Sequence, residues 1–154
     1  MKQHIAVVAA FLIALAPSQA RATDGDVVTR AEIQAERRAI VEATMKLDDP
    51  QARIFWPLYQ AYRDEVAPVN ERFFELVDEY TAAYETLTDA QASDMLDRWL
   101  DIEHRALEVR QKWVHRFRKA LPPRVVARYF QLDNKLDAVI REELARVIPL
   151  ARAM

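Results

Sequence analysis

The 154-residue chain contains no cysteine and only one glycine. Without cysteine it has no disulfides, no thiol catalysis, no thiolate metal site and no lipid-modified cysteine anchor. The one glycine, Gly25, lies near the N-terminus, so the rest of the chain lacks the residue that tight hairpin turns and phosphate-binding loops need. These absences argue against strand architectures and nucleotide-binding enzymes.

Signatures of catalysis are also missing from the sequence. We find no His-Glu-x-x-His metalloprotease motif and no nucleophile beside a glycine-built oxyanion hole. The carboxylates are spread over helix positions expected to face solvent. We therefore expect a protein that is not an enzyme and carries no cofactor.

The N-terminus has the pattern of a secretory signal peptide. Lys2 precedes an apolar run of 12 residues from Ile5 to Ala16, which is shorter than the roughly 20 residues of a membrane-spanning helix. Pro17 ends the run, and Ala20-Arg21-Ala22 offers a cleavage site. We expect a signal peptide at residues 1–22, cleavage after Ala22 and export to the periplasm without an integral membrane segment. The alternative is a retained membrane anchor.

The mature chain, residues 23–154, is expected to be one helical domain with a flexible N-terminus at residues 23–28. Removing Lys2 and Arg21 from the 22 cations leaves 20 against 24 acids, a net charge of -4 that disfavours nucleic acid as a partner. Prolines and capping residues divide the domain into helices at 29–46, 48–85, 87–120 and 122–149. The first begins with a capping box, Thr29-x-x-Glu32.

Short connections between long helices predict an elongated antiparallel bundle. Pro57 and Pro68 lie inside the second helix, so we expect it to be bent, or broken near Ala67-Pro68. Apolar residues at steps of three and four form one stripe on each long helix. The stripe of the second helix is Phe55, Tyr59, Tyr62, Val66, Val69, Phe73, Leu76 and Tyr80; that of the third is Ala92, Met95, Trp99, Ile102, Ala106, Val109, Trp113, Phe117 and Ala120.

Charge is segregated along the chain. Between Tyr62 and Glu103 there are 12 acids and three cations, whereas between Arg105 and Arg128 there are eight cations and one acid. In an antiparallel bundle, this order along the chain predicts one acidic tip and one basic tip.

Two segments share the form Leu-cap-x-x-Gln, Leu47-Asp48-Asp49-Pro50-Gln51 and Leu87-Thr88-Asp89-Ala90-Gln91. Leu47 and Leu87 would pack back on their helices, Asp48 and Thr88 would cap them, and Gln51 and Gln91 would reach back to the caps. Plain helix capping is sufficient to explain both segments.

The second segment resembles the LTxxQ motif of the Spy/CpxP-like family of periplasmic proteins, and the first is similar to a degenerate copy with Asp in place of Thr. The chain also resembles uncharacterised secreted Gram-negative proteins with patterns such as Phe55-Trp56-Pro57-x-Tyr59-x-x-Tyr62 and residues 128–136 here. Together these similarities cover most of residues 47–150. They imply a helical, often dimeric envelope-stress protein, either an ATP-independent chaperone or a protein linked to metal sensing. Chaperone members tend to have a basic cradle, whereas this mature chain is acidic overall.

Aromatic residues and cations are expected together at the basic tip, where they would hold partially folded client proteins. The candidate client-binding residues are Trp56, Tyr59, Arg105, Arg110, Lys112, Trp113, Arg116, Arg124, Arg128 and Phe130. The alternative for each ring is ordinary core packing. Trp56 and Phe130 lie off the main stripes and are the better candidates for a surface role.

A second hypothesis is metal binding by Asp101, His104 and Glu108, which are spaced by three and four residues on one helix. His115 would lie about 16 Å further along and could not join them. The alternative is a solvated charged face. The sequence therefore favours a binding protein for unfolded or envelope proteins, with a homodimer as a further expectation; a metal-responsive sensor or buffer and a structural subunit of an envelope complex remain alternatives.

Overall fold

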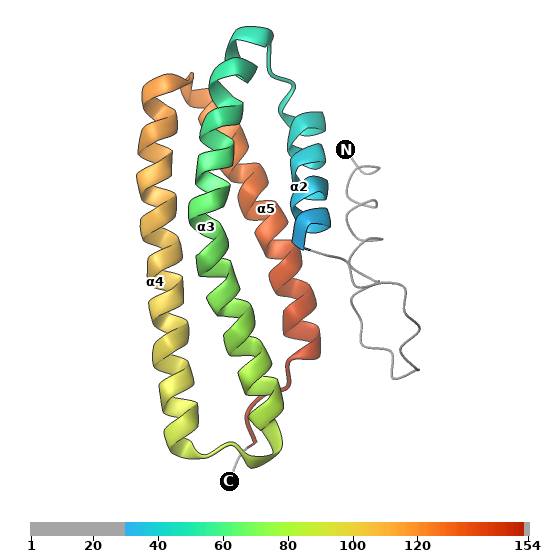
Figure 1. The fold of residues 1–154 in the computed structure, drawn as a ribbon, viewed down its shortest axis with the longest axis vertical. Helices are drawn as coiled ribbons and strands as arrows, with labels where there is room; N and C mark the ends of the chain where they lie inside the picture. Colours follow the sequence, from blue (N-terminus) through green and yellow to red (C-terminus); the bar gives the residue numbers. More distant parts are fainter. Residues whose placement is uncertain (1–29, 153–154) are drawn as a thin grey trace. The chain divides into compact units, whose positions relative to one another are not determined.

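The computed structural model describes residues 30–152. These residues form four α helices, α2 (Arg30–Met45), α3 (Asp49–Ala83), α4 (Asp89–Ala120) and α5 (Pro123–Val147), with a short 3-10 helix η2 (Tyr84–Thr86) after α3 (Figure 1). The described residues contain no strand, and the predicted all-α fold with a long second helix is confirmed. Across the same range, no helix combines the length and apolar character that a bilayer crossing requires.

Several expectations fall outside the described residues. These are the signal peptide, its cleavage site, the flexible N-terminus at 23–28 and the capping residue Thr29. The described chain divides into two compact units. The first, here called the hairpin unit, contains residues 47–128 and 150–152, and the second, the terminal unit, contains residues 30–46 and 129–149.

Helices α3 and α4 form the antiparallel hairpin that gives the first unit its name (Figure 1). Phe55 near the start of α3 packs edge-on against Phe117 near the end of α4, with ring centroids 5.8 Å apart. Near the opposite end, the Arg98 guanidinium donates to the Glu79 carboxylate at 2.5 and 2.9 Å. These two contacts set the register in which the helices pair.

The core of the hairpin unit follows the predicted apolar stripes. Its buried hydrophobic residues on the two long helices are Phe55, Tyr59, Tyr62, Val69, Leu76, Ile102, Val109, Trp113 and Phe117. Two members of the predicted α4 stripe, Trp99 and Ala120, are exposed, so the prediction was wrong for them. Ala120 is the last residue of α4, whereas Trp99 lies inside the helix, with the half-buried Met95 nearer the helix start.

Helix α3 is continuous over 35 residues despite two internal prolines. The alternative of a break near Ala67-Pro68 is therefore wrong. Pro57 and Pro68 are both exposed. The carbonyl groups that lose a backbone hydrogen-bond donor to each proline therefore lie on the solvent-exposed side of the helix. The rest of α3 keeps its buried face on both sides of each proline.

The helix starts confirm both predicted N-caps, and the complete capping box forms at the start of α4. The Thr88 hydroxyl accepts from the Gln91 backbone N–H at 3.3 Å, and the Gln91 side chain accepts from the Thr88 backbone N–H at 3.0 Å. At α3 the Asp48 carboxylate accepts from the Gln51 backbone N–H at 2.8 Å. Just after α2, Lys46 adopts a positive φ of 49°, the left-handed conformation that usually takes glycine at a helix end.

The terminal unit joins α2 to residues 129–147 of α5 through a buried ion pair. The Arg37 guanidinium donates to the Asp133 carboxylate at 2.5 Å and to the Asp137 carboxylate at 2.8 Å. Burial lowers the pKa of Arg37, but the two carboxylates outweigh burial and hold the pKa above its ordinary value. The other buried residues of this unit are Val41, Met45, Tyr129 and Leu136.

Candidate functional site

The hairpin places exposed cations at the end where α4 finishes and α5 begins. Antiparallel pairing brings the start of α3 to the same end, as the Phe55–Phe117 contact shows. We call this surface the basic end and define it by five exposed residues, Arg116, Arg118, Lys119, Arg124 and Arg128. Asp48 and Asp49 lie at the start of α3, and Asp48 is engaged as the helix cap.

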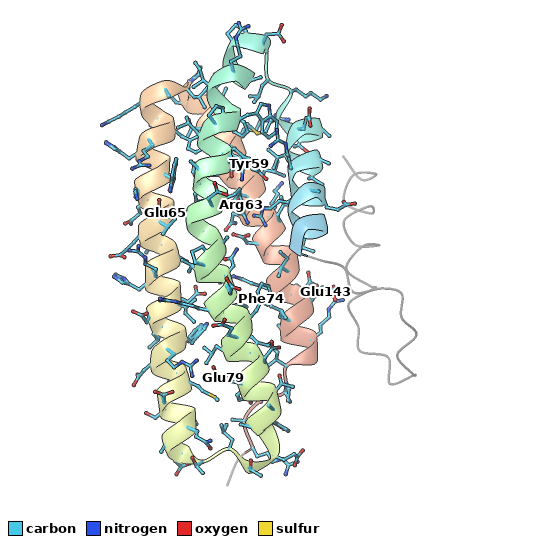
Figure 2. The ribbon with its side chains drawn as sticks, in the orientation of Figure 1. Tyr59, Arg63, Glu65, Phe74, Glu79 and Glu143 are labelled. Atoms are coloured by element: carbon cyan, nitrogen blue, oxygen red, sulfur yellow. The ribbon has the colours of Figure 1, made fainter. Side chains whose placement is uncertain are left out.

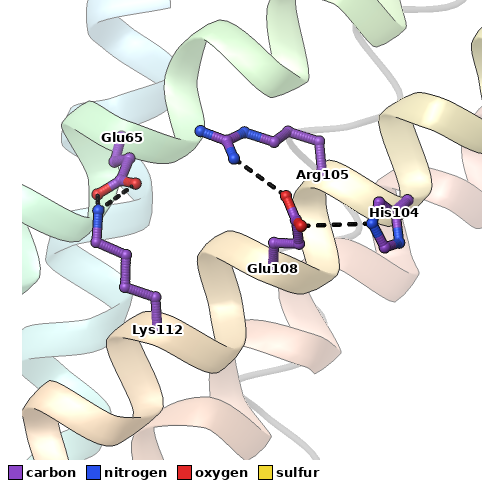
Figure 3. A network of polar contacts seen from close by, with 5 residues as sticks. All are labelled: Glu65, His104, Arg105, Glu108 and Lys112. Carbon is purple, nitrogen blue, oxygen red and sulfur yellow. Dashed lines mark hydrogen bonds and ion pairs between the residues drawn. The ribbon is translucent and has the colours of Figure 1, made fainter.

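Lys112, a predicted client-binding residue, is held within the hairpin by Glu65 of α3. Its ammonium group donates to the two Glu65 carboxylate oxygens at 2.7 and 2.8 Å (Figure 3). The Trp113 indole N–H donates to the same carboxylate at 2.8 Å. The hydrogen bond from Lys112 lowers the pKa of Glu65 against the opposing effect of burial, and Trp113 and Arg116 act in the same direction as Lys112.

Two predicted client-binding rings are inside the protein. Tyr59 and Trp113 expose 2% and 3% of their surfaces, so neither ring is offered to a client in this structure. Figure 2 shows Tyr59 on α3 one turn before Arg63, which is also buried. Their positions on helical stripes made core packing the stated alternative, and the structure bears out that alternative for both rings.

The remaining aromatic candidates are partly exposed. The Trp56 ring packs edge-on against Phe55 at 5.1 Å and Tyr59 at 5.4 Å, and part of it stays in contact with solvent. Ile54, two residues earlier and on another side of α3, is exposed. Phe130 is half-buried against Tyr129, with ring centroids 4.9 Å apart, and it belongs to the terminal unit.

The predicted arginines keep their charges near the surface. The Arg116 guanidinium lies over the Trp113 ring, 4.5 Å from its centroid, and covers the outer side of that buried indole. Arg105 donates to Glu108 at 3.0 Å. Arg124 and Arg128 are exposed and Arg110 is half-buried.

The metal hypothesis gains no support from the side-chain arrangement. Within residues 30–152, no group of three His, Cys, Asp or Glu side chains is placed to hold a metal ion. Glu108 instead pairs with Arg105, and its carboxylate lies 3.4 Å from the His104 Nε2 atom (Figure 3). Asp101 is exposed, and its grouping with His104 and Glu108 stays a prediction from spacing.

Sequence reasoning missed a set of exposed leucines on α4. Leu96, Leu100 and Leu107 expose 54%, 53% and 49% of their surfaces. Their spacing of four and seven residues is visible in the sequence as a second stripe, parallel to the one that packs on α3. The chain matches no family of known proteins, no curated protein and no solved structure.

Proposed function

We propose that this chain is a non-catalytic binding protein of the periplasm, which acts as a chaperone or envelope-stress adaptor by surface contact with partially folded proteins. The observation that carries the proposal is the collection of exposed cations at the basic end, the same end of the hairpin at which the partly exposed Trp56 and the exposed Ile54 lie. Such a surface attracts acidic chain segments and offers apolar contact to the residues next to them.

The strength of each contact favours reversible binding. An exposed ion pair contributes at most about 1 kcal/mol, so no one arginine holds a client. Several cations together create a local potential that speeds encounter and weakens as salt concentration rises. A client that folds and buries its own apolar residues would then leave the surface.

The LTxxQ-like segment has the capping geometry that its sequence predicts. Thr88 and Gln91 of the LTxxQ-like segment form a reciprocal capping box at the start of α4. Its role is to fix where α4 begins. Export to the periplasm rests on the N-terminal signal pattern.

The test is an aggregation assay with a chemically denatured acidic client, followed by light scattering. We expect the purified mature protein to suppress scattering at stoichiometric amounts. The double variant Arg118→Glu/Lys119→Glu should lose most of this suppression. The matched control Arg72→Glu/Lys135→Glu changes net charge equally at exposed positions away from the basic end and should keep it.

No suppression by the unmodified protein would contradict the chaperone role. Equal loss in both double variants would show that net charge, and not the basic end, is responsible. Circular dichroism of each variant establishes that the helices are intact before the comparison is made.

A further inference from the structure

Three cations at the basic end, which we call the free cations, have no partner within the described part of the chain. They are Arg118, Lys119 and Arg124, all exposed, and none of them forms a hydrogen bond, ion pair or ring contact with another described residue. Lys112, by contrast, is held by Glu65. The charges of the free cations are therefore available to a partner outside the chain.

The charge of this end is not neutralised by the rest of the hairpin unit. Residues 109–128 contain seven Lys and Arg residues and no Asp or Glu. Asp48 and Asp49 at the start of α3 offset part of this charge. Along α4, the opposite end of the hairpin lies about 48 Å away, because the helix has 32 residues. That distance is several times the roughly 8–10 Å over which charges act in physiological salt, so the acidic stretch leaves the basic end cationic.

The free cations point to different sides of the hairpin end. Arg118 and Lys119 are consecutive on α4, so their side chains leave the helix about 100° apart, and Arg124 belongs to α5. An extended chain segment that lies along one side of the hairpin meets only part of this set. A broad anionic surface that lies across the end meets all three.

The same end carries apolar side chains that suit the boundary between water and lipid. Ile54 exposes 44% of its surface, and Trp56 is partly exposed. Tryptophan favours the headgroup region of a bilayer, and long cationic side chains reach the phosphates while their stems lie along apolar groups. We propose that the basic end binds the surface of an anionic lipid bilayer, with the hairpin unit standing end-on.

The contact is peripheral and acts mainly through charge. Each Lys or Arg close to an anionic leaflet raises the partition coefficient about five-fold, so the three free cations together contribute about a hundred-fold. Salt weakens this attraction, which makes the binding reversible. The inference does not rest on the proposed function, since a bilayer can bind this end whether or not a client does.

Co-sedimentation of the mature protein with lipid vesicles tests this inference. One set of vesicles contains phosphatidylcholine alone, and the other contains phosphatidylcholine and phosphatidylglycerol in equal amounts. We expect binding to the mixed vesicles at low salt, little binding to phosphatidylcholine alone, and loss of binding to the mixed vesicles as the salt concentration rises.

Charge variants test whether the basic end makes the contact. Arg118→Glu/Lys119→Glu should lower the partition coefficient for the mixed vesicles about ten-fold or more. The matched control Arg72→Glu/Lys135→Glu makes the same change in net charge at exposed positions away from the basic end. It should lower the partition coefficient less than about three-fold, because screened charges act only over a short distance. Circular dichroism establishes that the helices of each variant are intact.

Apolar variants test the end-on orientation. Ile54→Ser should lower the partition coefficient a few-fold, because an apolar contact with the lipid is lost. Leu100 is also exposed but lies about 27 Å from Arg118 along α4, so Leu100→Ser should leave the partition coefficient unchanged.

No binding to the mixed vesicles at low salt would overturn the inference, even if the protein suppresses the aggregation of an acidic client. Equal loss of binding in the two double variants would also overturn it, because net charge would then be responsible. A larger effect of Leu100→Ser than of Ile54→Ser would show a side-on contact through α4 and would contradict the end-on arrangement. Vesicle binding without suppression of aggregation would support the inference and contradict only the proposed function.

Discussion

The buried pair of Arg37 and Asp133 is the residue-level feature on which the terminal unit depends most. Asp133 exposes 1% of its surface, and its carboxylate accepts from Arg37 at 2.5 Å. Replacing one member of a buried pair leaves the other charge without compensation, at a cost of about 3–5 kcal/mol. Arg37→Met should therefore lower the free energy of unfolding by about that amount, as measured by urea denaturation.

Removing both charges should be far less damaging. In Arg37→Met/Asp133→Leu no buried charge is stranded, so most of the lost stability should return. The exposed substitution Lys135→Met on the same helix is the control and should change stability by less than about 0.5 kcal/mol. If Arg37→Met were as stable as the Lys135→Met control, the result would contradict this account of the pair.

Glu65 gives the hairpin unit a defined dependence on pH. Its pKa is lowered in the folded protein from an ordinary value of 4.5, chiefly by the hydrogen bond from Lys112. A lowered folded-state pKa contributes stability that is present above pH 4.5 and is lost as the pH falls through the lowered value. Glu65→Gln should cost about 1 kcal/mol at pH 7, because it exchanges charge-assisted hydrogen bonds for neutral ones.

The cost of Glu65→Gln should shrink as urea denaturation is repeated at successively lower pH below 4.5. Glu75→Gln, an exposed neighbour on the same helix, is the matched control and should show a small and nearly constant effect. A Glu65→Gln deficit that stays the same at low pH would show that the ion pair is not its origin.

The sequence did not reveal that Arg37 and Asp133 pair with each other. Arg37 and Asp133 are 96 positions apart, and charged residues on amphipathic helices are normally solvated, so nothing local marks this pair as buried. Trp56 is different. Its position off the main stripe made it a candidate for a surface role, and the structure leaves its ring partly exposed.

At the scale of helices, local signals predicted the boundaries well. Asp48 and Thr88 cap α3 and α4 as expected, and Pro123 opens α5, because capping depends on residues within one turn. The sequence did not show which of the two apolar faces of α4 is buried. Periodicity identifies both faces, but which one is buried depends on the neighbouring helix, which is why the exposure of Leu96, Leu100 and Leu107 was missed.

The end of α2 offers a test of helix termination without glycine. Lys46 holds the left-handed conformation at φ 49°, which costs a residue with a Cβ about 1–2 kcal/mol. Lys46→Gly removes that penalty but also loosens the unfolded chain, so we expect a net gain of about 0.5–1 kcal/mol in thermal or urea denaturation. Lys46→Ala keeps the Cβ and should show no gain; equal stability of the two variants would contradict the strain.

At the scale of the whole molecule, the hairpin converts charge order along the chain into charge separation in space. The acidic stretch 62–103 and the basic stretch 105–128 both lie within the hairpin unit, so its fold alone separates them. This separation could be predicted from the sequence, because it needs only antiparallel helices and the count of charges. The identity of a client could not be predicted, because a surface of exposed cations is selective for charge and not for a defined shape.

The central claim is that clients bind at the basic end. The most direct measurement is an NMR titration of the isotope-labelled mature protein with a denatured acidic client, read from the backbone signals of residues 116–128. The account predicts shifts or broadening of the signals of residues 116–128 and Trp56, and little change around η2 at the opposite end of the hairpin. Changes confined to the η2 end, or no change at saturating client, would contradict the account.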